Sequence, residues 1–131
     1  MRKSSYFKFR YSQDWTEILT FSAAMEKKSG RQWQNIKKKL ESSSESEWKL
    51  AVTEAENLLD EILKRSGIVG ESFGEKINNI KPDQLKNVAD VKKVHEIRNS
   101  IMHNPDYVLS LDEAKRVLEV YERALRNLGL F

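Results

Sequence analysis

Apolar residues recur at steps of four and three between residues 48 and 63, and this spacing most constrains how the chain folds. The stripe consists of Trp48, Val52, Ala55, Leu59 and Ile62. Such spacing places side chains on one face of an α-helix and does not fit the two-residue period of a strand. Ser44 and Glu47 have the spacing of a capping box, and Gly67 suits a left-handed stop. The sequence therefore predicts a helix over residues 44–65.

Comparable stripes predict helices over much of the remaining chain. Pro82 suits the first turn of one of them, and an interruption between Asn87 and Asp90 would divide it in two. Ser29 with Gln32 has capping-box spacing, so we expect one helix to end before Ser29 and another to begin there. A short helix is expected near Phe73. The other predicted helices cover residues 13–28, 29–42, 82–103 and 110–128.

No segment alternates with period two for long enough to form a strand, so the expected fold class is all-α. The predicted architecture is an up-and-down four-helix bundle with an additional N-terminal helix and tail. We expect residues 1–30 to form the tail and first helix, and residues 31–131 to form the bundle. A chain of 131 residues is long enough for one domain with its own core.

Composition narrows the range of functions. The chain has no cysteine, which excludes disulfides, thiolate metal ligands and cysteine nucleophiles. A net charge of +3 and a pI near 9.1 permit contact with nucleic acid without requiring it. There is no run of about 18 apolar residues that would predict a membrane span. No apolar segment of a signal peptide follows the basic start, so we expect a cytoplasmic protein.

Two basic stretches allow contact with RNA. In the N-terminal tail, residues 6–11, aromatic side chains are interleaved with Lys8 and Arg10, which suits base stacking and phosphate neutralisation or docking on the bundle or a second subunit. Lys37, Lys38 and Lys39 form the other stretch, which is a solvated face or a phosphate contact. By contrast, four acidic side chains are predicted to form the solvated outer side of the helix over residues 44–65: Glu54, Glu56, Asp60 and Glu61.

A cluster of polar side chains lies in the helix predicted before Pro105. At about 100° per residue, four of them fall within an arc of about 140°. They are His95, Arg98, Asn99 and His103. Apolar residues occupy the opposite, core-facing side, namely Val94, Ile97 and Ile101. Groups that bind anions or move protons therefore line one side of a single helix beside the core.

These residue types suit RNA cleavage without a metal. The planar guanidinium of Arg98 matches a phosphate, and His103 can transfer a proton near neutral pH. Asn99 lies one turn before His103 and can orient it or a substrate oxygen. The ribose 2′-hydroxyl supplies the nucleophile, so the protein needs only to move protons and stabilise the transition state. The structural alternative is that Arg98 and His103 bond backbone carbonyls near the helix end and pair with acids such as Glu96 or Asp106.

The stretch from Arg98 to His103 resembles the signature of the HEPN superfamily, in which arginine and a polar residue precede histidine by three intervening residues. HEPN stands for higher eukaryotes and prokaryotes nucleotide-binding. The signature lies at the end of a late helix that one more long helix follows, as in that family. The wider resemblance to uncharacterised bacterial HEPN-like proteins covers roughly residues 31–129. Its matching segments are residues 47–52, 58–61, 95–103 and 109–122.

The resemblance implies a helical bundle, usually dimeric, in which two protomers form a composite metal-independent ribonuclease site. Arg98 and His103 would be the catalytic pair, with Asn99 as the polar residue after arginine. His95 and the three lysines, Lys37, Lys38 and Lys39, are candidates for substrate binding. Neither a metal nor a cofactor is expected.

Other HEPN-like proteins only bind nucleotides or proteins. A non-catalytic helical module with a protein or nucleotide partner is therefore the alternative prediction. Some family members carry a tyrosine two residues after the histidine, which a partner nucleotidyltransferase modifies. Here Pro105 occupies that position, which argues against this kind of partner.

Overall fold

The computed structural model describes residues 15–130, with side chains from residue 26 onward, and every regular element within them is helical. The described chain contains no strand, so the all-α prediction is confirmed. The aromatic and basic tail lies outside the described residues. The elements are α1 (Trp15–Lys38), a 3-10 turn η2 (Lys39–Glu41), α2 (Glu45–Arg65), α3 (Phe73–Asn78), α4 (Val88–His103) and α5 (Leu111–Asn127).

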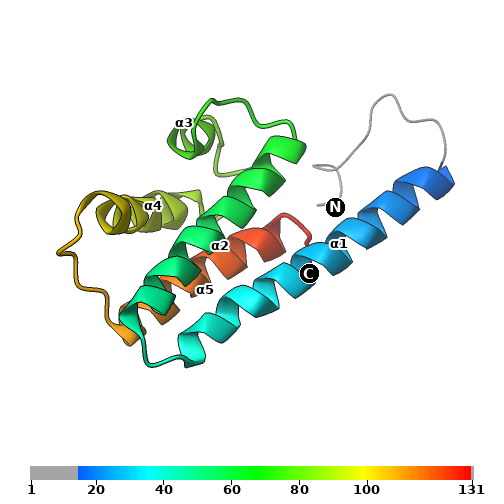
Figure 1. Ribbon diagram of the computed structural model, residues 1–131. Helices are drawn as coiled ribbons and strands as arrows, with labels where there is room; N and C mark the ends of the chain where they lie inside the picture. The colour runs from blue at the N-terminus through cyan, green and yellow to red at the C-terminus, as the bar shows by residue number, and fades with distance from the viewer. Residues whose placement is uncertain (1–14, 131) are drawn as a thin grey trace.

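The helices α2 and α5 form the centre of the molecule. They pack against each other, with α1 along one side and α4 on the opposite side, as Figure 1 shows. The short α3 packs on α4. One continuous core of buried apolar side chains draws on all five helices and on the turn before α4. This arrangement places the outer surface of α4 far from α1.

The predicted break between two N-terminal helices is wrong, because α1 runs without interruption through Ser29 and Gly30. Trp33 and Ile36 are 1% and 5% exposed, and Ser29 lies on the same face and is 3% exposed. A continuous helix keeps these positions aligned against the core, which outweighs the cost of about 1 kcal/mol for an internal glycine. The indole Nε1 of Trp33 also donates to Glu122 Oε1 of α5 at 2.9 Å. Capping-box spacing therefore did not mark a helix start here.

Two of the predicted helix-end signals are confirmed. Gly67 adopts φ +86°, and the amide of Ile68 donates to the carbonyl of Leu63 at 3.0 Å, which closes the C-terminal end of α2. At the start of α5, the Ser110 hydroxyl accepts from the amide of Glu113 at 3.0 Å. The corresponding side-chain bond is absent at Ser44, the N-cap of α2. Its hydroxyl is instead 2.8 Å from that of Ser46, so this part of the prediction is wrong.

The helix expected from Pro82 begins later, at Val88, after a turn over residues 81–85. Leu85 in this turn is 1% exposed and belongs to the core. Asn87, the N-cap residue, is 8% exposed, and its side-chain Nδ2 donates to the carbonyl of Val120 in α5 at 3.1 Å. This tertiary hydrogen bond fixes the entry to α4. The predicted division into two helices is wrong, because residues 82–87 form turns and Val88 to Asp90 are already helical.

Candidate functional site

Glu56 of α2 lies at the centre of the polar cluster, although it was predicted to be solvated. Its side chain is 2% exposed, so this prediction is wrong. The other three acidic side chains of that set do pair at the surface of the molecule. Glu54 pairs with Lys39, Asp60 pairs with Lys76, and Glu61 pairs with Arg65.

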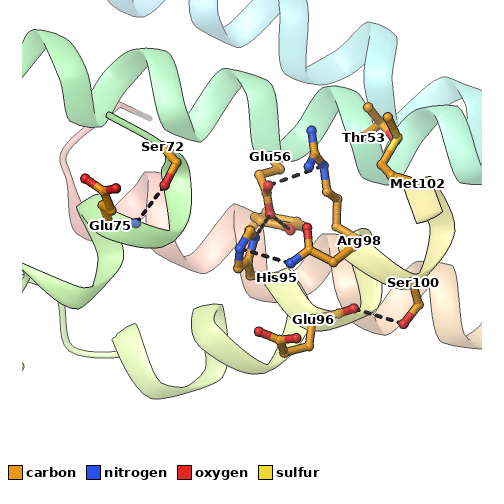
Figure 2. Close-up of polar contacts among 11 residues, drawn as sticks. Thr53, Glu56, Ser72, Glu75, His95, Glu96, Arg98, Ser100 and Met102 are labelled. Atoms are coloured by element: carbon orange, nitrogen blue, oxygen red, sulfur yellow. Dashed lines mark hydrogen bonds and ion pairs between the residues drawn. The ribbon is translucent and has the colours of Figure 1, made fainter. Parts of the chain in front are cut away.

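Three side chains from two other helices converge on the Glu56 carboxylate. Tyr121 of α5 donates its hydroxyl to Oε1 at 2.9 Å, and His95 of α4 lies 2.9 Å from the same oxygen through Nδ1. Arg98 Nε lies 3.3 Å from Oε2. Figure 2 shows His95 and Arg98 reaching Glu56 from one turn of α4. We call Glu56, His95, Arg98 and Tyr121 the Glu56 cluster.

The position of Glu56 follows from the helical period of α2. It lies four residues after Val52 and three before Leu59, both 0% exposed, so it belongs to the buried stripe. A buried carboxylate is strongly destabilised unless charges and hydrogen-bond donors compensate it. Glu56 has both, because Arg98 supplies the charge and Tyr121 and His95 supply the donors. The sequence signal that could have revealed it was a single acid inside an apolar stripe.

The orientation of His95 is fixed on both sides of its ring. A carboxylate only accepts hydrogen bonds, so Nδ1 carries the hydrogen that faces Glu56. The amide Nδ2 of Asn99 lies 3.3 Å from Nε2 on the other side of the ring. The ring centroid of Phe73 is 5.1 Å away, and a Cβ added to Gly74 would lie 3.3 Å from Nε2. Thus α3 packs directly on this ring.

Arg98 is held at one end and free at the other. Its side chain is 23% exposed, and its Nε is buried without a hydrogen-bond partner, so the 3.3 Å approach to Glu56 is an ionic contact. The two terminal nitrogens have no partner among the described residues and are not buried. In Figure 2 the side chain extends from α4 towards α2, with its guanidinium between Glu56 and Thr53. A planar cationic group with open donors is suited to an anion.

His103 lies apart from the Glu56 cluster. It is the last residue of α4, is exposed, and has no partner among the described residues. The alternative of pairing with an acid holds for Arg98, whose partner is Glu56 instead of Glu96 or Asp106, and His103 has no acidic partner among the described residues. The structure brings together His95, Arg98 and Asn99, and it leaves His103 at the helix end.

The three candidate lysines are on the other side of the molecule. Lys37 pairs with Glu122 of α5 at 3.4 Å, and Lys39 pairs with Glu54 of α2 at 2.9 Å. Lys38 is exposed. Lys37 lines a hollow of about 620 Å³ between α1 and α5. Because α1 and α4 flank the central helices on opposite sides, these lysines do not join Arg98 within one chain (Figure 1).

A smaller hollow of about 410 Å³ lies between α3 and α4 beside His95. Lys92 and Lys93 are exposed in its lining, and Glu96 lies with them. Neither lysine has a partner among the described residues. The side of the Glu56 cluster that faces α3 therefore carries positive charge.

Two groups near these sites have shifted pKa values. Burial raises the pKa of Tyr121, and the adjacent Glu56 carboxylate raises it further, so the phenol stays a hydrogen-bond donor. Partial burial raises the pKa of Glu122, but hydrogen bonds from Arg126 and Trp33 and the charge of Lys37 outweigh it and lower the pKa overall.

Comparison with protein-family models, curated proteins and solved structures found no match to this chain. Within the described residues, no three histidine, aspartate or glutamate side chains are grouped so that they could hold a metal ion. No helix of the described chain is long and apolar enough to cross a membrane.

Proposed function

We propose that this chain is a metal-independent endoribonuclease of the HEPN type that acts as a homodimer. In this proposal the fold is an up-and-down helical bundle, and α4 supplies Arg98, Asn99 and His103. The observation that supports it best is how the guanidinium of Arg98 is held. The guanidinium is fixed by Glu56 through Nε while both terminal nitrogens stay open. The same helix ends in a histidine with no partner among the described residues.

The reaction uses the substrate's own hydroxyl group. A base removes the proton of a ribose 2′-hydroxyl, whose oxygen attacks the adjacent phosphorus. The bond from phosphorus to the 5′-oxygen of the next nucleotide breaks, and an acid protonates that oxygen. The products are a 2′,3′-cyclic phosphate and a 5′-hydroxyl. His103 transfers protons, and the terminal nitrogens of Arg98 stabilise the charge on the phosphate oxygens.

The proposal includes a second subunit because Arg98 and His103 lie apart on the α4 helix of a single chain. Five positions along a helix correspond to about 140° of rotation and about 7.5 Å of rise. Arg98 points towards α2, and His103 is exposed at the helix end. Met102 of α4 is 52% exposed, and its sulfur lies 3.8 Å from the hydroxyl of Thr53 on α2. Leu50, three residues before Thr53 on α2, is 40% exposed. This apolar surface is the proposed contact between copies.

The alternative function is a non-catalytic helical module that binds a protein or nucleotide partner. The observation favouring it is that the Glu56 cluster joins α2, α4 and α5, so packing alone would account for His95 and Arg98. Packing does not account for His103, which is exposed. In the alternative, replacing His103 would change stability or partner binding and leave no RNA cleavage to lose.

The test is cleavage of a labelled single-stranded RNA in the presence of EDTA. We expect wild-type protein to release 2′,3′-cyclic phosphate ends, and we expect Arg98→Ala and His103→Ala to abolish this cleavage. Arg116→Ala is the matched control, because Arg116 is an exposed arginine of α5. Cleavage that persists in both site variants would show that the activity lies elsewhere. No cleavage by wild-type protein would favour the binding module.

The same preparation tests the dimer. Met102→Glu places a charge on the proposed contact, so we expect it to yield folded monomers and to lose cleavage. Val69→Glu is the control, because Val69 is 75% exposed in the loop before α3. Sedimentation velocity distinguishes the species. A fully active monomer would refute the composite site.

A further inference from the structure

Glu56 is the least exposed polar residue among those described, and the proposed reaction does not use it directly. It is 1% exposed, and its carboxylate faces groups from α4 and α5. Breaking a buried ion pair of this kind is strongly destabilising, whereas replacing the whole pair by apolar residues is often neutral. Core packing alone therefore gives no reason to place a carboxylate at this position.

The two oxygens of Glu56 have different partners. Oε1 accepts from Tyr121 at 2.9 Å and faces His95 Nδ1 at 2.9 Å. Among the described residues, Oε2 faces only Arg98 Nε, at 3.3 Å, and this contact lacks hydrogen-bond geometry. Two partners on Oε1 fix the plane of the carboxylate, so the position of Oε2 is set by α4 and α5 together. Oε2 is then a fixed negative charge beside the inner end of Arg98.

The contact through Nε has a consequence for binding. The strongest arginine–carboxylate pairs are bidentate and use two parallel N–H donors. Had Glu56 bound both terminal nitrogens of Arg98, the guanidinium would have had little capacity left for another anion. The observed contact instead leaves both terminal nitrogens accessible. Glu56 thereby holds the arginine without occupying the donors that would bind a phosphate.

We propose that Glu56 is a positioning residue for Arg98, holding its guanidinium so that the two terminal nitrogens bind a phosphate of the RNA strand. Tyr121 and His95 hold Glu56 in turn. This inference rests on the proposed function for its substrate, and its atomic basis is the unequal use of the two carboxylate oxygens. A misplacement of about 1 Å at a reacting centre can reduce a rate about 10²-fold.

The test compares Glu56→Gln with Glu56→Asp in full-length protein. Glutamine keeps the shape and removes the charge, so we expect kcat/KM to fall about 10²-fold, with both a lower kcat and a higher KM. Aspartate keeps the charge but shortens the side chain, so it should recover part of the rate. Glu61→Gln is the matched control, because Glu61 is 42% exposed on the same helix. All rates are taken well below each variant's melting temperature.

A second measurement separates this inference from the proposed function. The Nε–H resonance of Arg98, assigned with Arg98→Lys, is followed by NMR during titration with inorganic phosphate. We expect it to shift in wild-type protein and to need at least tenfold more phosphate in Glu56→Gln. Wild-type kcat/KM in Glu56→Gln, or an equal phosphate response, would overturn the positioning role while leaving the ribonuclease proposal intact. A positive titration without RNA cleavage would overturn only the proposed function.

Discussion

The two histidines of α4 are about two turns apart and lie in opposite environments. His95 is 13% exposed, and both ring nitrogens face partners, Glu56 on one side and Asn99 on the other. His103 is exposed and has no partner among the described residues. A ring held on both sides is suited to a fixed structural contact, whereas a ring in solvent is available to a substrate or to a second subunit. Their difference divides α4 into an anchored part and an open end.

The largest expected effect on stability comes from replacing Glu56, which holds the anchored part of α4. Glu56→Ala leaves Arg98 with an uncompensated buried Nε and removes the acceptor of Tyr121, so we expect a stability loss of about 3–5 kcal/mol. Urea denaturation measures it, with Glu61→Ala as the exposed control, expected to change stability by about 0.5 kcal/mol at most. A loss below about 1 kcal/mol would mean that the cluster does not hold the three helices together.

Replacing each histidine of α4 separately tests whether the helix has an anchored part and an open end. His95→Ala should lower stability by about 1–3 kcal/mol, because Glu56 loses a partner and Phe73 loses a packed ring. His103→Ala should change stability by no more than about 0.5 kcal/mol, because its ring is exposed and has no hydrogen-bond or ionic partner among the described residues. RNA cleavage should respond strongly to His103→Ala. A clear fall in melting temperature for His103→Ala without any cleavage in wild type would instead support the binding module.

The smallest expected effect concerns a carboxylate at the surface. Folding lowers the pKa of the Glu122 carboxyl below its value of 4.5 in the unfolded chain. The ionised form therefore stabilises the fold at pH values above 4.5, and this stabilisation is lost as the pH falls through the lower pKa of the folded state. Glu122→Gln should therefore be less stable than wild type at pH 7, and the difference should narrow as pH falls below about 4.5. Urea titrations at pH 7, 5 and 3 measure it. A constant difference would mean that charge is not the cause.

The local sequence predicted much of the fold. The stripe from Trp48 to Ile62 and the stop at Gly67 gave α2 nearly its observed limits, because side-chain period and left-handed backbone geometry are local properties. The continuity of α1 through Gly30 was not predictable in this way. It depends on Trp33 and Ile36 packing against other helices, and no local signal reports that packing.

For the candidate site too, the sequence predicted the local arrangement but not the tertiary contacts. Helical projection grouped His95, Arg98, Asn99 and His103 correctly on one helix, because their spacing is a property of the sequence alone. The sequence could not identify which of them would be anchored. That depends on Glu56, whose contacts with His95 and Tyr121 join residues 39 and 65 positions apart. A carboxylate is stable in the core only where such distant donors converge, and only tertiary packing brings them together.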